Sequence, residues 1–395
     1  MKIRLKPAAE RAVRGGHPWV FSDSVKSESR QGQLGDLATI YDRNDKFLAI
    51  GIYEPESPIR IRILHKGKPV QIDAAFRRQR FLKSINRRNH LFGSDTNGYR
   101  LINGESDGWP ALVLDRYDDT LVLKIYSTYW LTLLDELSAT IVDLLKPDHL
   151  VLRMSRNIQA LAAEQSNHSD GQMLIGDVSD PVLFSENGIC FESHVHAGQK
   201  TGFFLDQREN RQRVEQLAEG RTVLNCFSFS GGFSLYAARG DATSVADLDI
   251  SQHALESASR NFSLNEDDTR VSSCPREQIK ANAFDWLKDN PDRRFDMIIM
   301  DPPSLAKKKS ERKGAICAYQ QLTRVAIGIL ASDGILVSAS CSAHVRADEF
   351  FSAIPSTAQA SGRAFKELDR TLHAPDHPAS FPEAEYLKCI YLHFD

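Results

Sequence analysis

The chain has 395 residues, of which 42% are hydrophobic, and a formal net charge of −3. This length is sufficient for two or three domains with cores of their own, and no hydrophobic run is long enough to span a bilayer. The 6 cysteines include no Cys-x-x-Cys pair and no Cys/His cluster with metal-ligand spacing, so no zinc site is expected. Unpatterned cysteines, and first residues without the apolar core of a signal peptide, predict a cytoplasmic protein.

Charge is distributed unevenly along the chain. Residues 1–90 contain 19 Lys and Arg against 9 Asp and Glu, a balance of +10, so the rest of the chain has 30 against 43, a balance of −13. A basic front end on an acidic body predicts a nucleic-acid-binding module joined to an enzyme. Part of the excess lies in an amphipathic helical segment over residues 76–88. For that helix alone, a basic face that is simply solvated is an equally good interpretation.

The chain is expected to contain three domains, 1–70, 71–185 and 186–395. The first has short strands, starting with residues 1–6, separated by turns, which is typical of a small barrel. The second predicts a helix, strands near 99–104, 110–116 and 120–126, a helix near 130–146, a strand at 149–154 and a loop over 163–171. In the third, strands and helices alternate, which predicts a parallel α/β domain with right-handed crossovers.

A turn of small residues follows the first strand of the alternating segment. The run from Val223 to Phe233 predicts a strand, this turn and the start of a helix. Gly231 and Gly232 allow the backbone to approach a ligand closely, and the N–H groups of a helix start can bind a carboxylate. Because the turn lacks the pattern Gly-x-Gly-x-x-Gly, it indicates a ligand site only weakly by itself.

Polar residues also follow the next two predicted strands. Asp249 ends a strand about twenty residues after the turn. An acid at this spacing can accept hydrogen bonds from both hydroxyls of a ribose. The alternative role is an N-cap for a helix starting near Gln252, for which Ser251 would serve equally well. Asn282 follows a third candidate strand, where its amide can meet an adenine edge. Together these turns predict a nucleoside pocket.

Asp301 and Cys341 each follow a hydrophobic run, residues 295–300 and 334–339, that predicts a buried parallel strand. Because ligands of open α/β sheets bind beyond the carboxyl ends of the strands, the acid and the thiol are expected in one site. Together they are suited to covalent chemistry on an electron-poor ring. Most lone cysteines are small core residues, which is the interpretation for the other five. These are Cys190, Cys226, Cys274, Cys317 and Cys389. Position alone does not decide between the two interpretations for Cys341.

Several further motifs occur in order along the chain. They are Gly16-His-Pro-Trp-Val-Phe-Ser22, Asn103-Gly-Glu-Ser-Asp-Gly-Trp-Pro110, Asp115-Arg-Tyr117, Lys200-Thr-Gly-Phe-Phe-Leu-Asp-Gln-Arg208, Leu224-Asn-Cys-Phe-Ser228, Asp301-Pro-Pro303, Ser340-Cys341-Ser342 and Asp376-His-Pro378. Each motif is weak alone, but all of them in this order are highly specific. With them the chain resembles, over nearly its whole length, the RlmI-like class I S-adenosylmethionine-dependent methyltransferases. That family forms 5-methylcytosine in large-subunit ribosomal RNA.

The resemblance implies a fold, a cofactor and a partner. The fold would be α/β, a Rossmann-like seven-stranded methyltransferase domain preceded by a PUA β-barrel and a small α+β domain. The cofactor would be S-adenosyl-L-methionine, and the partner would be large-subunit ribosomal RNA; the sequence leaves homodimer formation open. The residues implied in cofactor binding are Gln207, Asn225, Phe227, Ser228, Gly231, Asp249, Asn282, Asp301 and Pro302. Many relatives have Asp at the position of Asn282, and a neutral amide binds an amine less strongly than a carboxylate does.

The resemblance also implies the catalytic residues Cys341 and Asp301. Carbon 5 of cytosine is a poor nucleophile until a thiolate adds to carbon 6 and makes carbon 5 enamine-like. Cys341 would be that nucleophile, and Asp301 would stabilise the charge that develops at N3 and the exocyclic amine. RNA cytosine methyltransferases with two cysteines have a second thiol just after their Asp-x-Pro motif. This chain has Ser304 there, so it resembles the one-cysteine type.

Two alternatives stay open at this point. Asp-Pro-Pro also occurs in enzymes that methylate guanine or an exocyclic amine, which need no nucleophilic cysteine. A different class of protein, an RNA-binding relative with an inactive catalytic domain, would have the same motifs in part. Cofactor binding and methyl incorporation would separate the inactive relative from the enzymes, and the position of the methyl group would separate the enzymes from each other.

Overall fold

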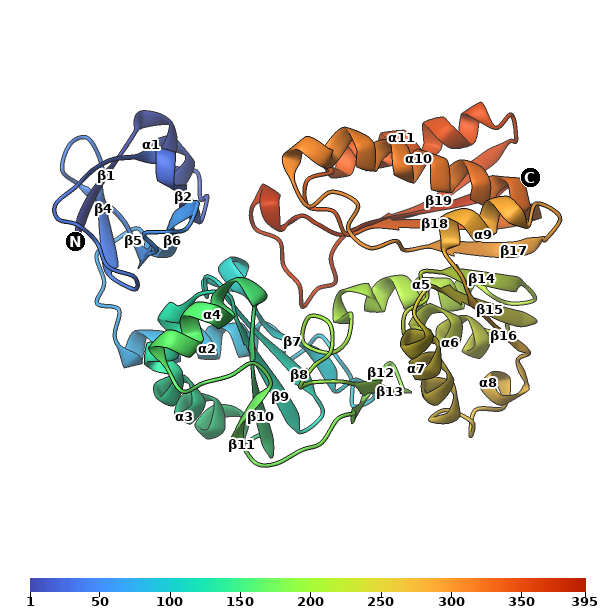
Figure 1. The fold of residues 1–395 in the computed structure, drawn as a ribbon, viewed down its shortest axis with the longest axis horizontal. Helices are drawn as coiled ribbons and strands as arrows, with labels where there is room; N and C mark the ends of the chain where they lie inside the picture. Colours follow the sequence, from blue (N-terminus) through green and yellow to red (C-terminus); the bar gives the residue numbers. More distant parts are fainter. The chain divides into compact units, whose positions relative to one another are not determined.

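The computed structural model describes residues 1–395, except for the side chain of Gln165. The chain divides into two compact units (Figure 1). The first contains Met1–Asn187, Ser193–Leu205 and Pro375–Phe381, and the second contains Gly188–Glu192, Asp206–Ala374 and Pro382–Asp395. No helix among the described residues is long and apolar enough to cross a membrane.

The first unit begins with a six-stranded sheet in the order β2-β6-β5-β4-β1-β3. β1 and β4 are parallel, and the other neighbours are antiparallel. Alternate residues such as Ala38 and Ile40 are buried, so one face of the sheet forms a core. The elements are β1 (Lys2–Leu5), α1 (Pro7–Arg14), β2 (Trp19–Phe21), the 3₁₀-helix η1 (Ser22–Ser24), β3 (Val25–Glu28), β4 (Leu37–Tyr41), β5 (Phe47–Tyr53) and β6 (Ile59–Lys66).

A five-stranded sheet in the order β11-β10-β9-β8-β7 follows in the same unit. Its elements are α2 (Ala74–Asn86), β7 (Gly98–Asn103), η2 (Gly104–Asp107), β8 (Leu112–Tyr117), β9 (Thr120–Ile125), η3 (Thr128–Leu133), α3 (Leu134–Leu145), β10 (His149–Met154), α4 (Arg156–Gln165) and β11 (Gln172–Ile175). The predicted loop over residues 163–171 is partly wrong, because α4, which is rich in good helix formers such as Ala, Gln and Glu, extends to Gln165. The strand β12 (Val182–Glu186) also belongs to the first unit, whereas β13 (Ile189–Ser193) belongs almost entirely to the second.

The two sheets of the first unit share a hydrophobic core. Ile52 of β5 and Leu64 of β6 belong to the same buried cluster as Trp109 and Trp130. The strands of the six-stranded sheet therefore depend on the segment that follows them for part of their burial. Domain boundaries near residues 70 and 185 stay predictions.

The arginines of α2 and of the two residues that follow it are mostly bonded within the first unit. The pairs are Arg77 with Glu136, Arg78 with Asp143, and both Arg87 and Arg88 with Asp107. Arg80 donates to the carbonyls of Leu64 and Gly108, and burial lowers its pKa to about 10. Much of the excess positive charge of residues 1–90 is thus neutralised by carboxylates that follow in the sequence.

The second unit is built on a seven-stranded sheet in the order β16-β15-β14-β17-β18-β20-β19. The strands from β16 to β18 are parallel, and β20 is antiparallel to both of its neighbours. Residues 297–300 of the central strand β17 are all buried, as expected for a parallel strand covered on both faces. In Figure 1, α10 and α11 lie on one face of the sheet and α6 and α7 on the other. The predicted Rossmann-like fold class is confirmed.

The helices and strands of the second unit alternate as the sequence predicts. They are η4 (Leu205–Gln207), α5 (Arg208–Leu217), β14 (Thr222–Cys226), α6 (Gly232–Arg239), β15 (Ser244–Asp249), α7 (Gln252–Ser263), α8 (Thr269–Ser273), β16 (Arg276–Lys280), α9 (Ala283–Asp289), β17 (Phe295–Met300), η5 (Lys309–Glu311), α10 (Arg312–Ile329), β18 (Leu330–Ser340), α11 (Ala347–Ala360), β19 (Phe365–Thr371), η6 (Pro382–Ala384) and β20 (Lys388–Phe394).

Candidate active site

The carboxyl ends of four neighbouring parallel strands form one edge of the second unit's sheet. β14 pairs with β15 and β17, and β17 pairs with β18, so that Cys226 at the end of β14 lies opposite Met300 at the end of β17. Asp249 ends β15, Asp301 follows β17, and Cys341 follows β18. The parallel arrangement therefore brings the predicted ribose-binding acid, the second acid and the thiol to the same edge of the sheet.

The turn between β14 and α6 has an unusual backbone. Phe227 and Phe229 have φ values of 61° and 48°, a region that residues other than glycine seldom adopt. Gly231 has a φ of 73°, and a Cβ built on it would lie 2.8 Å from the Cβ of Ala258. Only glycine fits this position, and α6 begins directly after it without a side-chain cap. The N–H groups of the first turn of α6 thus remain available to a negatively charged ligand group.

A buried polar network lies beneath this turn. Asn225 donates through Nδ2 to Ser234 Oγ at 3.0 Å and to Asp247 Oδ1 at 3.2 Å, and Ser234 Oγ donates to the same Asp247 oxygen at 2.6 Å. Burial raises the pKa of Asp247 to about 6, although these two hydrogen bonds act in the opposite direction. Asn225 Oδ1 and Ser228 Oγ are buried and have no hydrogen-bond partner. Such atoms are suited to polar groups of a ligand.

Asp249 accepts backbone hydrogen bonds from the turn after β14 and from the turn after β15. Its Oδ2 accepts from Phe229 N at 2.9 Å, and its Oδ1 accepts from Ser251 N at 2.8 Å. Ser251, not Asp249, caps α7 by accepting from Ala254 N, so the acid is not needed as a helix cap. Each carboxylate oxygen retains a lone pair for a ribose hydroxyl. Next to it, the apolar side chain of Ile250 is 68% exposed.

Asn282 is the N-cap of α9. Its Oδ1 accepts from Phe284 N at 2.9 Å. One lone pair of the only acceptor atom in this side chain is therefore already used, which weakens the predicted recognition of the adenine amine. The ring of Phe284 lies edge-on to Phe227, at 6.0 Å between centroids, and offers apolar surface at the same place.

The Asp301 carboxylate is oriented by a chain of amides. Gln207 Nε2 donates to Asp301 Oδ2 at 2.9 Å, and Asn210 Nδ2 donates to Gln207 Oε1 at 2.6 Å. Asn210 Oδ1 in turn accepts from the hydroxyls of Thr371 and Tyr391. Gln207 and Asp301 are thus brought together, although they lie far apart in the sequence.

The thiol of Cys341 lies against the Asp-Pro-Pro segment. Its Sγ is 3.9 Å from the carbonyl oxygen of Pro302, and the residue is partly exposed. The following residue, Ser342, holds the two segments together, because its Oγ accepts from Leu305 N at 3.0 Å and lies 3.0 Å from Tyr319 OH. Burial, with negative charge on Cys341 and Asp301, raises the pKa of Tyr319 to about 12, so this hydroxyl stays protonated.

The other five cysteines mostly have the predicted core positions. Cys226, Cys274 and Cys389 are buried, and burial raises the pKa of each thiol. Cys190 is partly buried. The prediction is wrong for Cys317, which is exposed, because it lies on the outer face of the amphipathic helix α10.

Several residues near the site did not emerge from the sequence. They are Asn210, Ser234, Asp247, Ile250, Tyr319 and Lys388. Two of these residues stand out in the sequence, because each is a charged residue in or beside a hydrophobic strand. Asp247 is a carboxylate within the hydrophobic strand β15, and Lys388 is a charged residue at the start of the hydrophobic strand β20. Buried charges in such strands are unusual enough to indicate a specific role.

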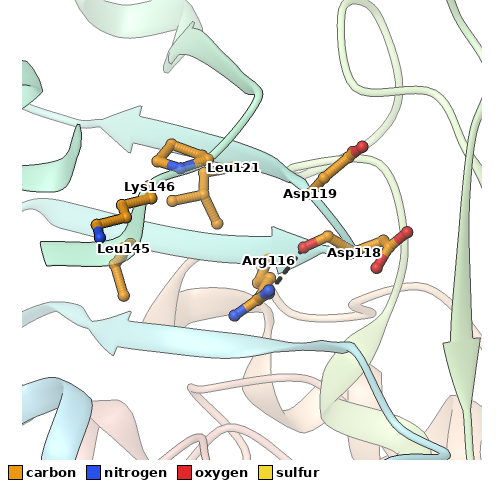
Figure 2. Close-up of a pocket in the computed structure, with 7 residues that line it drawn as sticks. Arg116, Asp118, Asp119, Leu121, Leu145 and Lys146 are labelled. Carbon is orange, nitrogen blue, oxygen red and sulfur yellow. Dashed lines mark hydrogen bonds between the residues drawn. The ribbon is translucent and has the colours of Figure 1, made fainter. Parts of the chain in front are cut away.

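Figure 2 shows a small pocket in the first unit, at the turn between β8 and β9 and the end of α3. Its lining includes Arg116, Asp118, Asp119, Leu121, Leu145 and Lys146. Arg116 Nε donates to the Asp118 carbonyl at 2.7 Å. None of the predicted site residues lines this pocket, so it is separate from the candidate active site.

Comparison with known proteins places the chain among methyltransferases. Residues 99–392 match the family model of S-adenosylmethionine-dependent methyltransferases, and residues 3–66 match a PUA-like domain. The chain is 51% identical to "Ribosomal RNA large subunit methyltransferase" of Deinococcus radiodurans, covering 100% of this chain and 98% of the relative. It is 35% identical to "Ribosomal RNA large subunit methyltransferase I" of Pseudoalteromonas atlantica, covering 98% of both.

Solved structures support the fold. A protein from Streptococcus mutans assigned as a SAM-dependent methyltransferase superposes with a TM-score of 0.84 at 22% identity, over 100% of both chains. A SAM-dependent methyltransferase from Agrobacterium tumefaciens has a TM-score of 0.53 at 16% identity and covers 77% of this chain and 91% of that one. With a matching family model over most of its length and relatives of this identity, the chain belongs to the S-adenosylmethionine-dependent methyltransferases with an N-terminal PUA-like domain, and S-adenosylmethionine is its cofactor.

Proposed function

We propose that the protein methylates carbon 5 of a cytosine in large-subunit ribosomal RNA through a covalent adduct with Cys341. The observation that supports this most directly is the partly exposed thiol, 3.9 Å from the Pro302 carbonyl and therefore beside Asp301, at the edge of the sheet where ligands bind. Two relatives are named "Ribosomal RNA large subunit methyltransferase" and "Ribosomal RNA large subunit methyltransferase I", which supports large-subunit ribosomal RNA as the substrate.

The residues around the glycine turn fit the cofactor. Asn225 Oδ1 and Ser228 Oγ, which are buried without partners, would receive polar groups of its methionine part, and the first N–H groups of α6 would meet its carboxylate. Asp249 would accept from the ribose hydroxyls. The exposed side chain of Ile250 and the ring of Phe284 would border the adenine. Phe227 and Gly231 give the turn its shape. Gln207, which is bonded to Asp301, and Pro302, which follows Asp301, would border the cofactor on that side.

Bound S-adenosylmethionine supplies an electrophilic methyl group. The Cys341 thiolate would form a bond to carbon 6 of the cytosine, which makes carbon 5 nucleophilic. Asp301, held by Gln207, would accept from the exocyclic amine and, carrying a proton, donate to N3, where negative charge develops as the thiolate adds. Once carbon 5 carries the methyl group, its proton would pass to a base, the bond between sulfur and carbon 6 would break, and the thiolate would be restored. Ser304 stands where a second cysteine would assist release, so release would proceed without it.

The position of the methyl group tests this proposal. Ribosomal RNA incubated with the protein and isotope-labelled cofactor would be digested to nucleosides and analysed by mass spectrometry. We expect label in 5-methylcytidine. Label in a guanine derivative or in an exocyclic amine would contradict the carbon 5 mechanism, and the absence of any label despite cofactor binding would indicate an inactive relative.

Asp249→Ala should weaken cofactor binding by on the order of 1–3 kcal/mol, because it removes two acceptors for ribose hydroxyls. Isothermal titration calorimetry with S-adenosylmethionine measures this change. Asp267→Ala, the same substitution at an exposed acid of the second unit, should leave the affinity unchanged. Equal affinities of the Asp249 variant and the wild type would remove Asp249 from the site.

We also propose that the PUA-like segment binds RNA through phosphate groups. Residues 1–66 contain 12 Lys and Arg against 8 Asp and Glu, and Lys6 and Arg11 at the start of the segment are exposed. Replacing both by Glu should weaken RNA binding and lower the slope of log K against log salt by about 0.7–0.9 for each lost phosphate contact. Filter binding at several salt concentrations measures both quantities. Lys366→Glu on the edge strand β19 is the matched control. If the two variants have the same slope, the proposed RNA surface is wrong.

A further inference from the structure

Lys388 is a lysine with no exposed surface in the core of the second unit. It is the first residue of β20 and pairs with Ser340 at the end of β18, one residue before Cys341. The residues that follow it, Cys389 to Leu392, are all buried and apolar or aromatic. Burying an ammonium group costs free energy unless the group interacts favourably with its surroundings, so this position calls for a specific partner.

The ammonium group is directed at the turn that contains Cys341. Lys388 Nζ donates to the carbonyl oxygen of Ser342 at 2.8 Å and to that of Val345 at 2.6 Å. Both acceptors are main-chain carbonyls, so neither neutralises the positive charge. These two bonds fix the backbone just after Cys341, while the Ser342 hydroxyl fixes the same turn to the segment after Asp301.

Among the ionisable side chains that act on the pKa of Lys388, Cys341 has the largest effect. Burial lowers the pKa of Lys388 to about 8, and negative charge on Cys341, then on Glu385 before β20 and on Glu349 of α11, acts to raise it. Negative charge on Cys341, like that on Asp301, also acts on Tyr319. The Pro302 carbonyl accepts from the Cys341 thiol and so favours its protonated form. The positive charge of Lys388 acts in the opposite direction, because it favours the negatively charged thiolate.

We propose that Lys388 is a positioning residue for Cys341, which holds the turn after β18 in place and favours the thiolate over the thiol. The inference rests on the proposed role of Cys341 as the nucleophile. The Cys341 thiol releases its proton to water, and Lys388 keeps its own proton throughout. The thiolate then forms the bond to carbon 6, and that bond breaks again when the product is released. In this scheme the ammonium group contacts neither the base nor the cofactor. It affects the reaction only by favouring the thiolate form of Cys341.

The proposal predicts a change in the reactivity of Cys341. In Lys388→Met, alkylation of Cys341 by iodoacetamide should be about tenfold slower at pH 7 than in the wild type, because a nearby cation increases the thiolate fraction. The difference should shrink above pH 8, where the wild-type lysine loses its charge. Peptide mass spectrometry resolves each cysteine, and exposed Cys317 in the same sample is an internal standard whose rate should not change. Identical pH profiles for Cys341 in the two proteins would overturn the proposal.

A matched variant separates charge from burial. Lys124 is also largely buried, donates to the Lys200 carbonyl, and has its pKa lowered by burial to about 8, but it belongs to the first unit. Lys124→Met therefore removes a similar buried lysine and should leave the alkylation profile of Cys341 unchanged. If this variant slowed Cys341 as much as Lys388→Met does, the effect would be general destabilisation and the proposal would fail.

A second measurement leaves Lys388 intact, in case Lys388→Met does not fold. The titration of Lys388 Nζ is followed by nitrogen-15 NMR in protein with labelled lysine. Cys341→Ala should move the midpoint of this titration to lower pH, because the negative charge of the thiolate is lost; an unmoved midpoint would contradict the proposal. Neither readout uses methyl transfer. Full methyl transfer by Cys341→Ala would reject the proposed function without affecting these results, whereas unchanged titrations would reject the role of Lys388 alone.

Discussion

Replacing Cys341 by Ala should reduce methyl transfer to ribosomal RNA by a factor on the order of 10³ or more, because no other group can form the bond to carbon 6. Ser342, the residue after Cys341, is hydrogen-bonded to Ser304, and both hydroxyls are also bonded to main-chain groups of the segment after Asp301. Binding of S-adenosylmethionine should be nearly unchanged, since Cys341 follows β18 and is not among the proposed cofactor residues, most of which follow β14, β15, β16 and β17. Incorporation of labelled methyl groups and calorimetry measure the two quantities separately.

A trapping experiment tests the same residue in the intact enzyme. With 5-fluorocytosine in the target RNA, a covalent complex with the wild type should accumulate. The fluorine on carbon 5 cannot be removed by a base as the hydrogen is, so the thiolate cannot be eliminated. Cys341→Ala should form no such complex, whereas Cys317→Ala, a change at an exposed cysteine of α10, should form it normally. Full activity in the Cys341 variant would favour methylation of another base atom.

Asp107→Ala should destabilise the first unit by about 3–5 kcal/mol, because it leaves a buried arginine without its counter-charge. The side chains of Asp107 and Arg88 are 2% and 1% exposed, and Asp107 accepts from Arg88 Nη1 at 2.9 Å and Nη2 at 2.7 Å. Asp107 Oδ2 also accepts from Asn103 N at 2.7 Å. The loss therefore affects a charge pair and a backbone hydrogen bond together.

Urea unfolding followed by tryptophan fluorescence measures this loss, since Trp109 and Trp130 are buried in the adjacent core. The matched control is Asp143→Ala, which removes the partner of Arg78 on the surface. Because the side chains of that pair are 46% and 62% exposed, we expect a cost below about 1 kcal/mol. Similar midpoints for the two variants would show that the buried pair is not a major source of stability.

This network gives a physical role to the motif from Asn103 to Pro110. Glu105 accepts from Trp19 Nε1 at 2.8 Å and from Arg62 at 3.0 Å, which joins the motif to the six-stranded sheet. Asn103 donates to the Pro378 carbonyl, and Asp376 accepts from Arg100 N, all within the first unit. The motif that identifies the family in this part of the chain is therefore a structural junction.

The sequence by itself determined the alternation of strands and helices in the second unit and the residues at the strand ends. Local patterns are sufficient for this, because a hydrophobic run followed by Asp301 or Cys341 predicts a buried parallel strand whose carboxyl end bears that residue. Similarly, Ser251 was recognisable as an equal candidate for the cap of α7, and the structure shows that it is the cap.

Only the tertiary structure decided how these residues are supported. Three contacts join different elements of the fold: Gln207 donates to Asp301, Lys388 donates to the turn after Cys341, and Arg88 pairs with Asp107. No local periodicity in the sequence encodes which buried polar groups meet in this way. The charge sum over residues 1–90 overstates the unpaired positive charge for the same reason, because it does not include the carboxylates beyond that limit that pair with Arg77, Arg78 and Arg88. Pairing of polar groups across a core is set by packing and by the cost of leaving them unpaired.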